Sequence, residues 1–441
     1  MTTIVWFRND LRLADNPALA EAAARGPVVP VYVWAPEEEG EWPPGAASRW
    51  WLHRSLHALD RSLRERGSQL VVRRGPTNEA LASLLRETGA ASVVWNRRYE
   101  PAAIARDTEL KRRLPGAASF GAGLLREPWT VATRTGGPYQ VFTPFWRALQ
   151  ALGEPEAPLP VVRPAAPSQW PQSLTIEQLG LRPAISWDAG LAETWTPGEQ
   201  GAHDRLEQFR DHAAGYGYAR DHPSRATSRL SPHLHFGEIS PRQAWRAVRD
   251  AAGEAATPFL RQLAWREFAH HLLYHFPATP SQPLRPAYAG MPWRDDPAGL
   301  AAWQRGRTGY PLVDAGMREL WQTGWMHNRV RMVAASFLTK HLLIDWREGT
   351  RWFWDTLVDA DLANNTLGWQ WVAGSGADAA PYHRIFNPAA QADRFDGDGR
   401  YRARWLGEGE AASAIVDHAT ARERALAAYG AMTVYRSHHP S

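Results

Sequence analysis

Short apolar runs alternate with helical patterns over the first 113 residues, and this alternation constrains the fold more than any other feature. The apolar runs have the length of strands and occupy residues 2–7, 28–34, 70–73 and 92–95. Helical patterns occupy residues 47–66, 77–88 and 101–113. Strands that alternate with helices predict a parallel sheet of the α/β class. The segment after the first strand, RNDLRLADNPAL, lacks the glycine pattern of a Rossmann or Walker loop, which argues against such a site there.

The rest of the chain divides into a proline-rich connector and a helical region. Seven prolines crowd the connector, namely Pro155, Pro158, Pro160, Pro164, Pro167, Pro171 and Pro183. Apolar residues then recur at helical spacing through 203–215, 241–252, 257–275, 312–322, 325–343 and 418–430. We therefore expect an α/β domain over residues 1–130, a proline-rich linker over 131–200 and an all-helical domain over 201–441.

Tryptophan is unusually abundant, with 23 residues. Packing alone rarely needs so many, because each buried indole N–H must find a partner. Stacking on bases or on an aromatic cofactor is one use for them. Arginine dominates over lysine and the sequence pI is about 9.4, which permits an anionic partner such as nucleic acid without requiring one.

Several classes of site and location are excluded or not expected. Cysteine is absent, which excludes disulfides, thiolate catalysis and iron–sulfur clusters. The chain has no H-E-x-x-H motif, and the adjacent His270 and His271 face different ways on a helix, so we expect no metal site. The N-terminus lacks a signal peptide and no apolar run approaches ~20 residues, so we expect a cytoplasmic protein with no membrane span.

The stretch 345–388 is the richest in chemical groups. Within thirteen residues it places two aspartates, two asparagines and two tryptophans, namely Asp359, Asp361, Asn364, Asn365, Trp369 and Trp371. Such a set suits a ring ligand, because the polar groups can bind its edge while the indoles cover its faces. Short polar side chains beside Gly368 predict a turn into a site. The alternative is an acidic loop followed by two core tryptophans.

Three further patterns could belong to the same site. Thr227–Ser231, which reads TSRLS, can present hydroxyls and backbone N–H groups to a phosphate, although a helix-capping segment explains it as well. Gln262, Trp265 and Arg266 share one helix face, which could stack on a base and bond to it. The alternative is an amphipathic helix with its tryptophan at the core margin.

A third helix face carries Asn328, Arg331 and Met332. Arg331 could pair with Asp359 or Asp361, since either carboxylate would be costly to bury alone.

Long motifs of the helical region resemble the photolyase/cryptochrome family, as does IVWFRNDLRLADNPAL at 4–19. The motifs are TGYPLVDAGMREL (308–320), GWMHNRVRM (324–332), LLIDWREG (342–349), DADLANN (359–365), GWQWVAGSGADAAP (368–381) and RIFNP (384–388). The resemblance covers nearly the whole chain and is strongest to DNA photolyases that act on cyclobutane pyrimidine dimers. It implies an α/β antenna domain followed by an all-helical domain that binds FAD.

Carried over position by position, the resemblance implies a set of FAD-binding residues. They are Tyr216, Thr227, Ser228, Arg229, Leu230, Ser231, Asn328, Arg331, Asp359, Ala360, Asp361 and Asn365. Asn365 would face flavin N5. An amide there does not readily donate a proton, so Asn365 favours the fully reduced flavin that repair requires, whereas plant cryptochromes carry an acid at this place.

The resemblance also assigns tryptophans to electron transfer. Trp369, Trp346 and Trp293 would relay electrons between flavin and surface, and Trp303 is a candidate for a branch. The residues alone leave open that all are core tryptophans.

DNA-binding residues follow from the same resemblance. They are Arg220, Gln262, Trp265, Arg266, Arg329, Met332, Trp371 and Arg384. Trp265 and Trp371 would stack on the flipped-out dimer, Met332 would lie under it, and the arginines Arg220, Arg329 and Arg384 would bind flanking phosphates.

The sequence departs from the family pattern at several places. Gln262 stands where many dimer photolyases carry Glu, and His383 stands where an aromatic ring is common. Ala102 and Ala103 stand where folate-binding enzymes carry Asn and Glu, whereas deazaflavin binders usually have an acid near Arg98. The spelling LGWQW resembles the third class of bacterial photolyases, so we favour methenyltetrahydrofolate as the second chromophore, with deazaflavin as the alternative.

The expected function is light-driven repair of cyclobutane pyrimidine dimers in UV-damaged DNA by a monomer that needs no protein partner. The main alternative is a cryptochrome, a blue-light photoreceptor without repair activity. A (6-4) photolyase is disfavoured because MHNR at 326–329 lacks the paired histidines of the animal-type enzymes. A light-independent flavin redox enzyme would need a nicotinamide site, which the sequence does not show.

Overall fold

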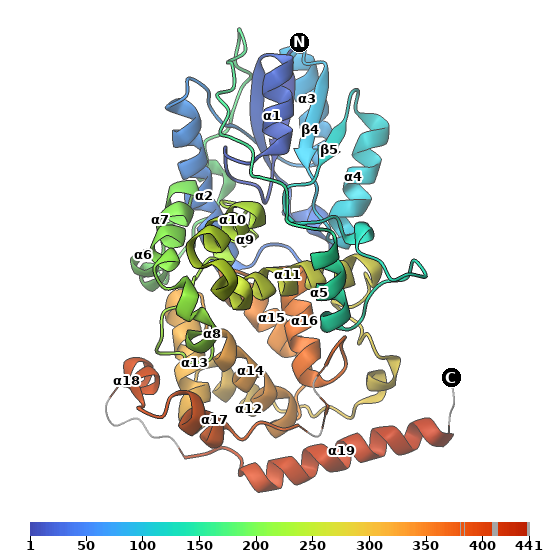
Figure 1. Cartoon of the computed structure of the whole chain (residues 1–441), viewed down its shortest axis with the longest axis vertical. Helices are drawn as coiled ribbons and strands as arrows, with labels where there is room; N and C mark the ends of the chain where they lie inside the picture. The colour runs from blue at the N-terminus through green and yellow to red at the C-terminus, as the bar shows by residue number, and fades with distance from the viewer. Residues whose placement is uncertain (380, 383, 408–412, 439–441) are drawn as a thin grey trace.

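The protein has two parts, an α/β domain and a larger helical domain, as the computed structural model in Figure 1 shows. The structure describes residues 1–379, 381, 382, 384–407 and 413–438. The fold class expected from the sequence is confirmed. None of the described helices is both long and apolar enough to cross a membrane.

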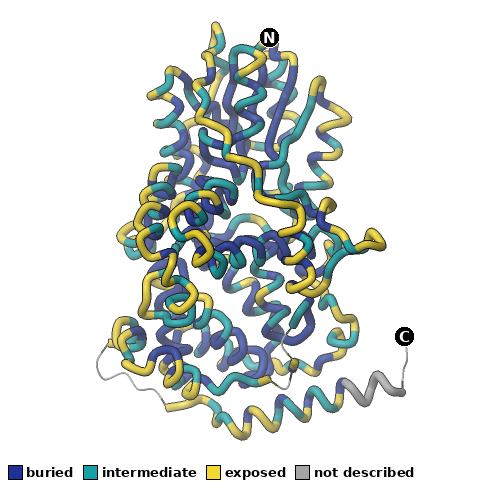
Figure 2. Tube along the Cα trace, viewed as in Figure 1, coloured by how far each residue is buried: buried dark blue, intermediate teal, exposed yellow. Residues whose placement is uncertain are grey.

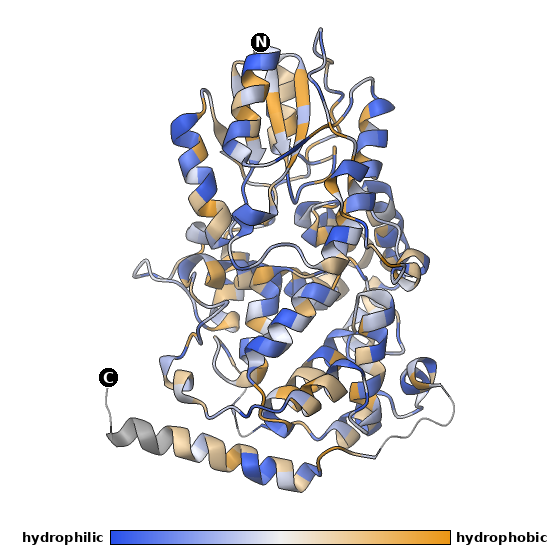
Figure 3. Ribbon diagram, turned by 180° about the vertical axis from the view of Figure 1, so that it is seen from behind, coloured by the Kyte–Doolittle hydropathy of each residue, from blue (hydrophilic) through white to orange (hydrophobic). Residues whose placement is uncertain are grey.

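The sheet of the α/β domain contains five parallel strands in the order β3-β2-β1-β4-β5. The strands are β1 (Thr3–Phe7), β2 (Val28–Trp34), β3 (Val71–Arg74), β4 (Ser92–Asn96) and β5 (Ala118–Phe120). Around them lie α1 (Pro17–Arg25), α2 (Ala46–Arg64), α3 (Thr77–Thr88) and α4 (Pro101–Arg113). β1, β2 and β4 are buried along their whole length, because helices cover both faces of the sheet. Figure 3 shows these strands as the most hydrophobic part of the domain.

The segment expected as a linker contains helical structure. It holds α5 (Phe142–Ala151), the single-turn helix η3 (Glu177–Leu179) and α6 (Ala189–Thr194). Phe142, Phe145 and Trp146 of α5 are buried in the core of the helical domain. The extended part of the segment lies between α5 and η3, where the prolines are concentrated.

The helical domain is built around α11 (Thr257–His275), whose backbone is largely buried across the middle of the molecule in Figure 2. The other helices are α7 (Glu199–Arg210), α8 (Tyr216–Ala219), α9 (Ser231–His235), α10 (Pro241–Ala252), α12 (Pro297–Gln304), α13 (Pro311–Thr323), α14 (Asn328–Ser336), α15 (Trp346–Thr356), α16 (Leu362–Ala373), α17 (Pro388–Phe395), α18 (Arg400–Leu406) and α19 (His418–His438). Helix α14 continues into a π-helical turn, Phe337–His341.

The two domains meet at the carboxyl ends of the strands. The Leu11 amide donates to the Phe236 carbonyl at 3.1 Å, and the Arg12 guanidinium donates to the Gly237 carbonyl at 2.8 Å. Gly237 has φ +63°, and a Cβ there would lie 2.1 Å from the Asn9 carbonyl oxygen. Only glycine therefore permits this close approach of the two backbones.

Candidate functional site

A cavity of about 500 Å³ in the helical domain gathers most of the residues predicted to bind FAD or DNA. Those that line it are Tyr216, Arg220, Thr227, Ser228, Arg229, Leu230, Ser231, Gln262, Trp265, Arg266, Asn328, Arg331, Met332, Asp359, Ala360, Asp361, Asn365, Trp369 and Trp371. They come from α8 and the residue after it, the segment that leads into α9, α11, α14, the segment before α16, and α16 itself. Segments separated by more than 150 residues therefore contribute to one wall, which only the tertiary fold can arrange.

Asp361 is one of two aspartates that line the cavity. It caps α16, accepting a hydrogen bond from the Asn364 amide at 2.8 Å. Its other oxygen lies 3.4 Å from Nε2 of His270, which comes from α11. Burial raises the pKa of Asp361, but His270 and His235, whose Nδ1 lies 3.8 Å from the carboxylate, outweigh burial and hold the pKa well below its usual range. The Asp361 carboxylate is therefore ionised at neutral pH.

Arg331 and Asp359 form the ion pair expected from the sequence. The guanidinium donates to both carboxylate oxygens of Asp359, at 3.1 and 2.9 Å, and also to the Met326 carbonyl at 2.7 Å. Nη2 serves both carboxylate oxygens while Nε bonds to Met326, and these contacts hold both side chains in one orientation at the cavity wall. Asn365 is fixed from the other side, because its amide donates to the Thr350 carbonyl of α15 at 3.1 Å.

Trp265 presents a ring of fixed orientation to the cavity. It stacks on Phe142 of α5 with centroids 3.8 Å apart and planes 7° apart. Arg266 lines the cavity too, but its guanidinium donates to the Gly123 carbonyl at 2.6 Å and so also ties α11 to the segment after β5. Gln262 donates weakly to the Pro258 carbonyl within its own helix, at 3.4 Å.

The segment Thr227–Ser231 enters the cavity through an unusual backbone conformation. Arg229 has φ +49°, a left-handed value that is rare for a residue other than glycine. Its guanidinium lies 4.8 Å over the ring of Trp325, which contributes a cation–π contact. The Ser231 hydroxyl accepts a hydrogen bond from the Trp325 indole at 3.2 Å, so part of its hydrogen-bonding capacity is used within the protein.

Trp369 is buried between α16 and α15. Its ring lies 5.0 Å from Phe353 and 6.1 Å from Trp303. A Cβ on Gly349 would come within 2.0 Å of the Trp369 ring, so the absence of a side chain at Gly349 makes room for the indole. The Trp369 indole nitrogen is buried and has no hydrogen-bond partner among the described residues.

Four predicted site residues lie outside the cavity. Trp346 is buried and shares an apolar cluster with Trp369, and the half-buried Trp293 packs against that cluster. Arg329 pairs with Asp221 and stacks over Phe395, whereas Arg384 is exposed. His383 lies outside the described residues.

One interpretation of an individual residue needs correction. The turn predicted at Gly368 is wrong, because Gly368 lies within α16, the helix that Asp361 caps. A Cβ on Gly368 would meet no atom within 4 Å, so this glycine keeps space open in the cavity. Trp303, the candidate branch, is fully buried, lies 6.1 Å from the Trp369 ring and donates to the Ala334 carbonyl at 3.0 Å; its place in a branch stays a prediction.

Sequence reasoning missed several residues of the site. Phe142 supports Trp265 from a segment expected to be a linker, and Gly349 makes room for Trp369. His270 was considered only as a metal ligand, whereas it pairs with Asp361. No local pattern marks these roles, since each depends on a contact between distant segments.

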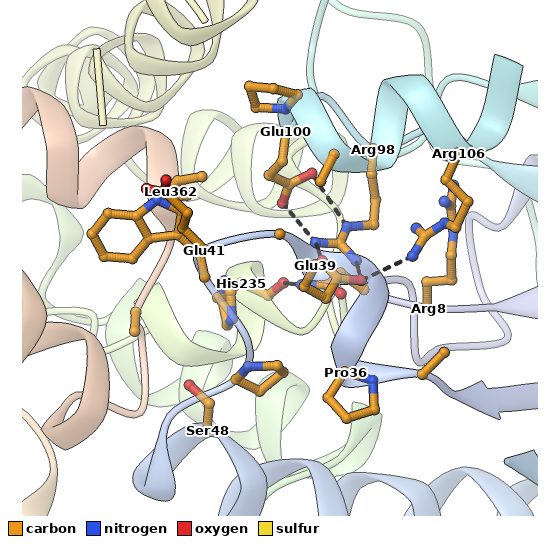
Figure 4. A pocket seen from close by; sticks show the side chains of 18 of the residues that line it. Arg8, Pro36, Glu39, Glu41, Ser48, Arg98, Glu100, Arg106, His235 and Leu362 are labelled. Carbon is orange, nitrogen blue, oxygen red and sulfur yellow. Dashed lines mark hydrogen bonds and ion pairs between the residues drawn. The ribbon is translucent and has the colours of Figure 1, made fainter. Parts of the chain in front are cut away.

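A second cavity of about 320 Å³ lies between the two domains, at the carboxyl ends of β1 and β2 (Figure 4). Arg98 donates to both oxygens of Glu39, at 2.9 and 2.8 Å, and Arg106 donates to the same carboxylate at 3.0 Å. Burial raises the pKa of Glu39, but the two arginines outweigh it and hold the pKa at about 2. Glu100 also contacts Arg98, at 3.2 Å.

Aromatic rings border this interdomain cavity. Trp34, Trp42 and Trp354 line it, and Trp42 meets Trp354 edge to face at 5.4 Å. Of the two alanines noted in the sequence, Ala102 lines the cavity and Ala103 is buried in α4. The site can accept a flat ligand.

A helical domain with an acid-lined and tryptophan-lined cavity, joined to an α/β domain with a five-stranded parallel sheet, defines a class of flavin-binding proteins. Family models described as "DNA photolyase" and "FAD binding domain of DNA photolyase" match residues 3–165 and 259–414. The chain therefore belongs to the photolyase/cryptochrome family.

Three relatives place the chain within the family. It is 48% identical to a deoxyribodipyrimidine photo-lyase of Agrobacterium fabrum, over 97% of this chain and 98% of the relative. It is 41% identical to Arabidopsis thaliana cryptochrome-2, over 92% of this chain and 70% of that one. A crystal structure of a bacterial class III photolyase from Agrobacterium tumefaciens superposes with a TM-score of 0.93 at 48% identity, covering 98% of both chains.

The residues present fit FAD. The cavity volume lies in the range of cofactor sites. The hydroxyls of Thr227 and Ser228 beside the cation of Arg229 suit a diphosphate, and Asp359, Asn365 and the indoles suit a ring with polar edges.

Proposed function

We propose that this protein is a deoxyribodipyrimidine photo-lyase that uses blue light to repair cyclobutane pyrimidine dimers in DNA. One observation carries the proposal: Trp265 and Trp371, two rings suited to stacking on a flipped-out lesion, border the same cavity as the FAD residues. A lesion in that cavity would lie beside the cofactor. The name of the Agrobacterium fabrum relative supports the same activity.

FAD, when reduced and excited by blue light, supplies the electron that splits the dimer. The chain positions the reactants. Trp265 cannot rotate freely because Phe142 covers one face at 3.8 Å, so its other face can receive a base without loss of ring freedom. A dimer that has lost its pairing costs less to extrude from the duplex, which favours damaged over intact DNA.

The aspartates that would lie beside the cofactor are each paired with a basic side chain. Asp359 is paired with Arg331, and the ionised Asp361 is paired with His270, so each carboxylate already has a basic partner within the protein. Asn365 adds an amide, which does not readily donate a proton. An amide at this place therefore favours retention of the fully reduced cofactor.

DNA binding would use arginines at the edge of the site. Arg220 lines the cavity and is half-buried, and Arg384 is exposed, so both can reach phosphates. Arg329 is paired with Asp221 and would exchange this partner for a phosphate. Affinity should therefore fall as salt concentration rises.

Electron transfer to the cofactor would pass through Trp293, Trp346 and Trp369. The three rings belong to or pack against one apolar cluster, which supports a continuous route from the half-buried Trp293 to the cavity. Trp303 and Phe353 also contact Trp369 and offer a buried side path.

The interdomain cavity would hold a second, light-harvesting chromophore. Its aromatic lining supports a flat ring, and we favour methenyltetrahydrofolate. The two acids bonded to Arg98 keep deazaflavin as the alternative. Absorbance spectra and mass spectrometry of chromophores released from the purified protein distinguish the two.

The test of the main proposal is repair of an oligonucleotide that carries one thymine cyclobutane dimer. Reduced holoenzyme is illuminated with blue light, with a dark sample and a (6-4) oligonucleotide as controls. We expect restoration of the dimer in the light sample only. If flavin is bound and photoreduced but no dimer is repaired, the protein acts instead as a cryptochrome-type photoreceptor, in keeping with its 41% identity to a plant cryptochrome. Gln262→Glu is then the first variant to assay for recovered repair.

A further inference from the structure

Three potential metal ligands meet on the surface of α2, although the sequence predicts no metal site. His53 and His57 lie one turn apart on α2, and Glu177 begins η3 in the proline-rich segment. One ligand atom from each residue lies within 4.8 Å of those of the other two. None of the three lines either chromophore cavity, so the proposed function does not account for them.

The geometry leaves one nitrogen unsatisfied. Nε2 of His57 lies 2.9 Å from a Glu177 carboxylate oxygen, and the two imidazole rings are 4.7 Å apart. Nε2 of His53 is buried and has no hydrogen-bond partner among the described residues. A buried polar atom without a partner costs free energy, and a cation bound between the three side chains would remove that cost.

We propose that His53, His57 and Glu177 bind a divalent transition-metal ion, with zinc as the best match. Two histidines separated by one helical turn plus one carboxylate form a common three-ligand set for zinc, and water supplies the fourth ligand. The His57 and Glu177 side chains are 42% and 62% exposed, so water can reach the ion.

Binding requires a small rearrangement of the ligands. At a zinc–nitrogen distance of about 2.0–2.1 Å, tetrahedral ligand atoms lie about 3.4 Å apart. No separation here exceeds 4.8 Å, so the three side chains need to close by no more than about 1.4 Å. Rotation of the exposed Glu177 side chain can supply this movement. Arg54 and Arg182 lie close enough to His53 to repel a cation, which makes the site weaker than a four-ligand structural site.

The ion would attach the proline-rich segment to the α/β domain. The same segment already contacts α2 at a second point, where the Trp50 indole donates to Asp188 at 2.9 Å. Ile176 and Leu179 are buried in the same apolar cluster as Leu56 of α2. A metal ion bound by Glu177 would therefore limit the movement of the proline-rich segment between these contacts with α2. Its binding would also stabilise the folded chain by mass action.

The experiment titrates full-length, chelator-treated holoprotein with cobalt(II) chloride and then with zinc chloride. Tetrahedral cobalt gives visible absorption bands, and the absence of cysteine removes thiolate absorption from the spectrum. Three variants are compared: His53→Ala/His57→Ala, Glu177→Gln and the matched control His212→Ala. His212 is exposed and lies outside the cluster.

We expect one cobalt per chain in the wild type and in His212→Ala, displaced by zinc. The double histidine variant should lose the bands. Glu177→Gln should weaken metal binding more than tenfold. Mutating a residue that only contacts a metal ligand typically lowers metal affinity by about 10–100-fold, and removing a ligand itself should cost more. Zinc should also slow proteolysis of the proline-rich segment in the wild type and not in Glu177→Gln. If the wild type and the double histidine variant bind cobalt equally, the proposed metal site is wrong. Equal binding by Glu177→Gln overturns the proposed link to the segment.

Discussion

Gly349→Ala tests whether close packing of Trp369 on α15 shapes the FAD site. The added methyl would lie 2.0 Å from the Trp369 ring, and an ordinary contact needs at least 3.4 Å, so the ring or the helix must move by about 1.4 Å. The ring has little room to yield, because Phe353 and the fully buried Trp303 pack against it.

The stability change follows from two opposing effects. Overpacking a core costs about 1–3 kcal/mol, and the rigid surroundings of Trp369 place this case near the upper end. Replacing glycine by alanine within a helix gains about 1 kcal/mol. We therefore expect a net loss of about 2 kcal/mol in the free energy of unfolding. Because Trp369 also lines the cavity, FAD occupancy should fall as well.

Urea unfolding of the apoprotein and the FAD-to-protein absorbance ratio measure the two effects. Gly430→Ala is the matched control, since it also lies within a helix, α19, and a Cβ there would meet no atom within 4 Å. This control should be unchanged or slightly more stable. If Gly349→Ala is as stable as Gly430→Ala and retains FAD, the packing argument is refuted.

Three further outcomes are expected. Trp371→Ala should weaken binding to dimer-containing DNA in a gel-shift assay while FAD stays bound, and unchanged affinity would exclude a stacking role. Trp293→Phe should slow photoreduction of oxidised FAD but spare repair by chemically reduced enzyme; undiminished photoreduction would place the surface end of the relay elsewhere. Burial raises the pKa of Glu267 from 4.5 to about 7, so the folded state keeps a proton that the unfolded state releases. The stability from this bound proton is fully present below pH 4.5 and is lost as the pH rises to about 7. At 1.36 kcal/mol per pH unit, wild type should lose up to about 3 kcal/mol relative to Glu267→Gln over this window in urea unfolding; parallel pH profiles would contradict the assignment.

Much of the fold was predictable because the strands and early helices follow local patterns. The four predicted strands and the helices at 77–88 and 101–113 agree with β1–β4, α3 and α4 to within a residue. The helix predicted at 325–343 instead begins at Asn328, because His327 caps it by accepting from the Arg329 amide at 3.2 Å. α15 and α16 were not predicted: α16 contains two asparagines and a glycine, and its helical conformation depends on the Asp361 cap and on burial.

The sequence predicts which residues belong to the site but not how their side chains are arranged. Long motifs that resemble one family carry most of its residues, and the cavity gathers them. The pairing of Asp361 with His270 and the stacking of Trp265 on Phe142 join segments that are 91 and 123 residues apart, so no local pattern can encode them.

The sequence by itself determined the fold class, the family and the types of side chain in the site, because strand and helix periodicity and contiguous motifs are local properties of the chain. Only the tertiary structure decided which residues support those side chains, which carboxylate pairs with which cation, and that His53, His57 and Glu177 meet. These contacts arise when distant segments pack together, and packing is specified by the whole folded chain.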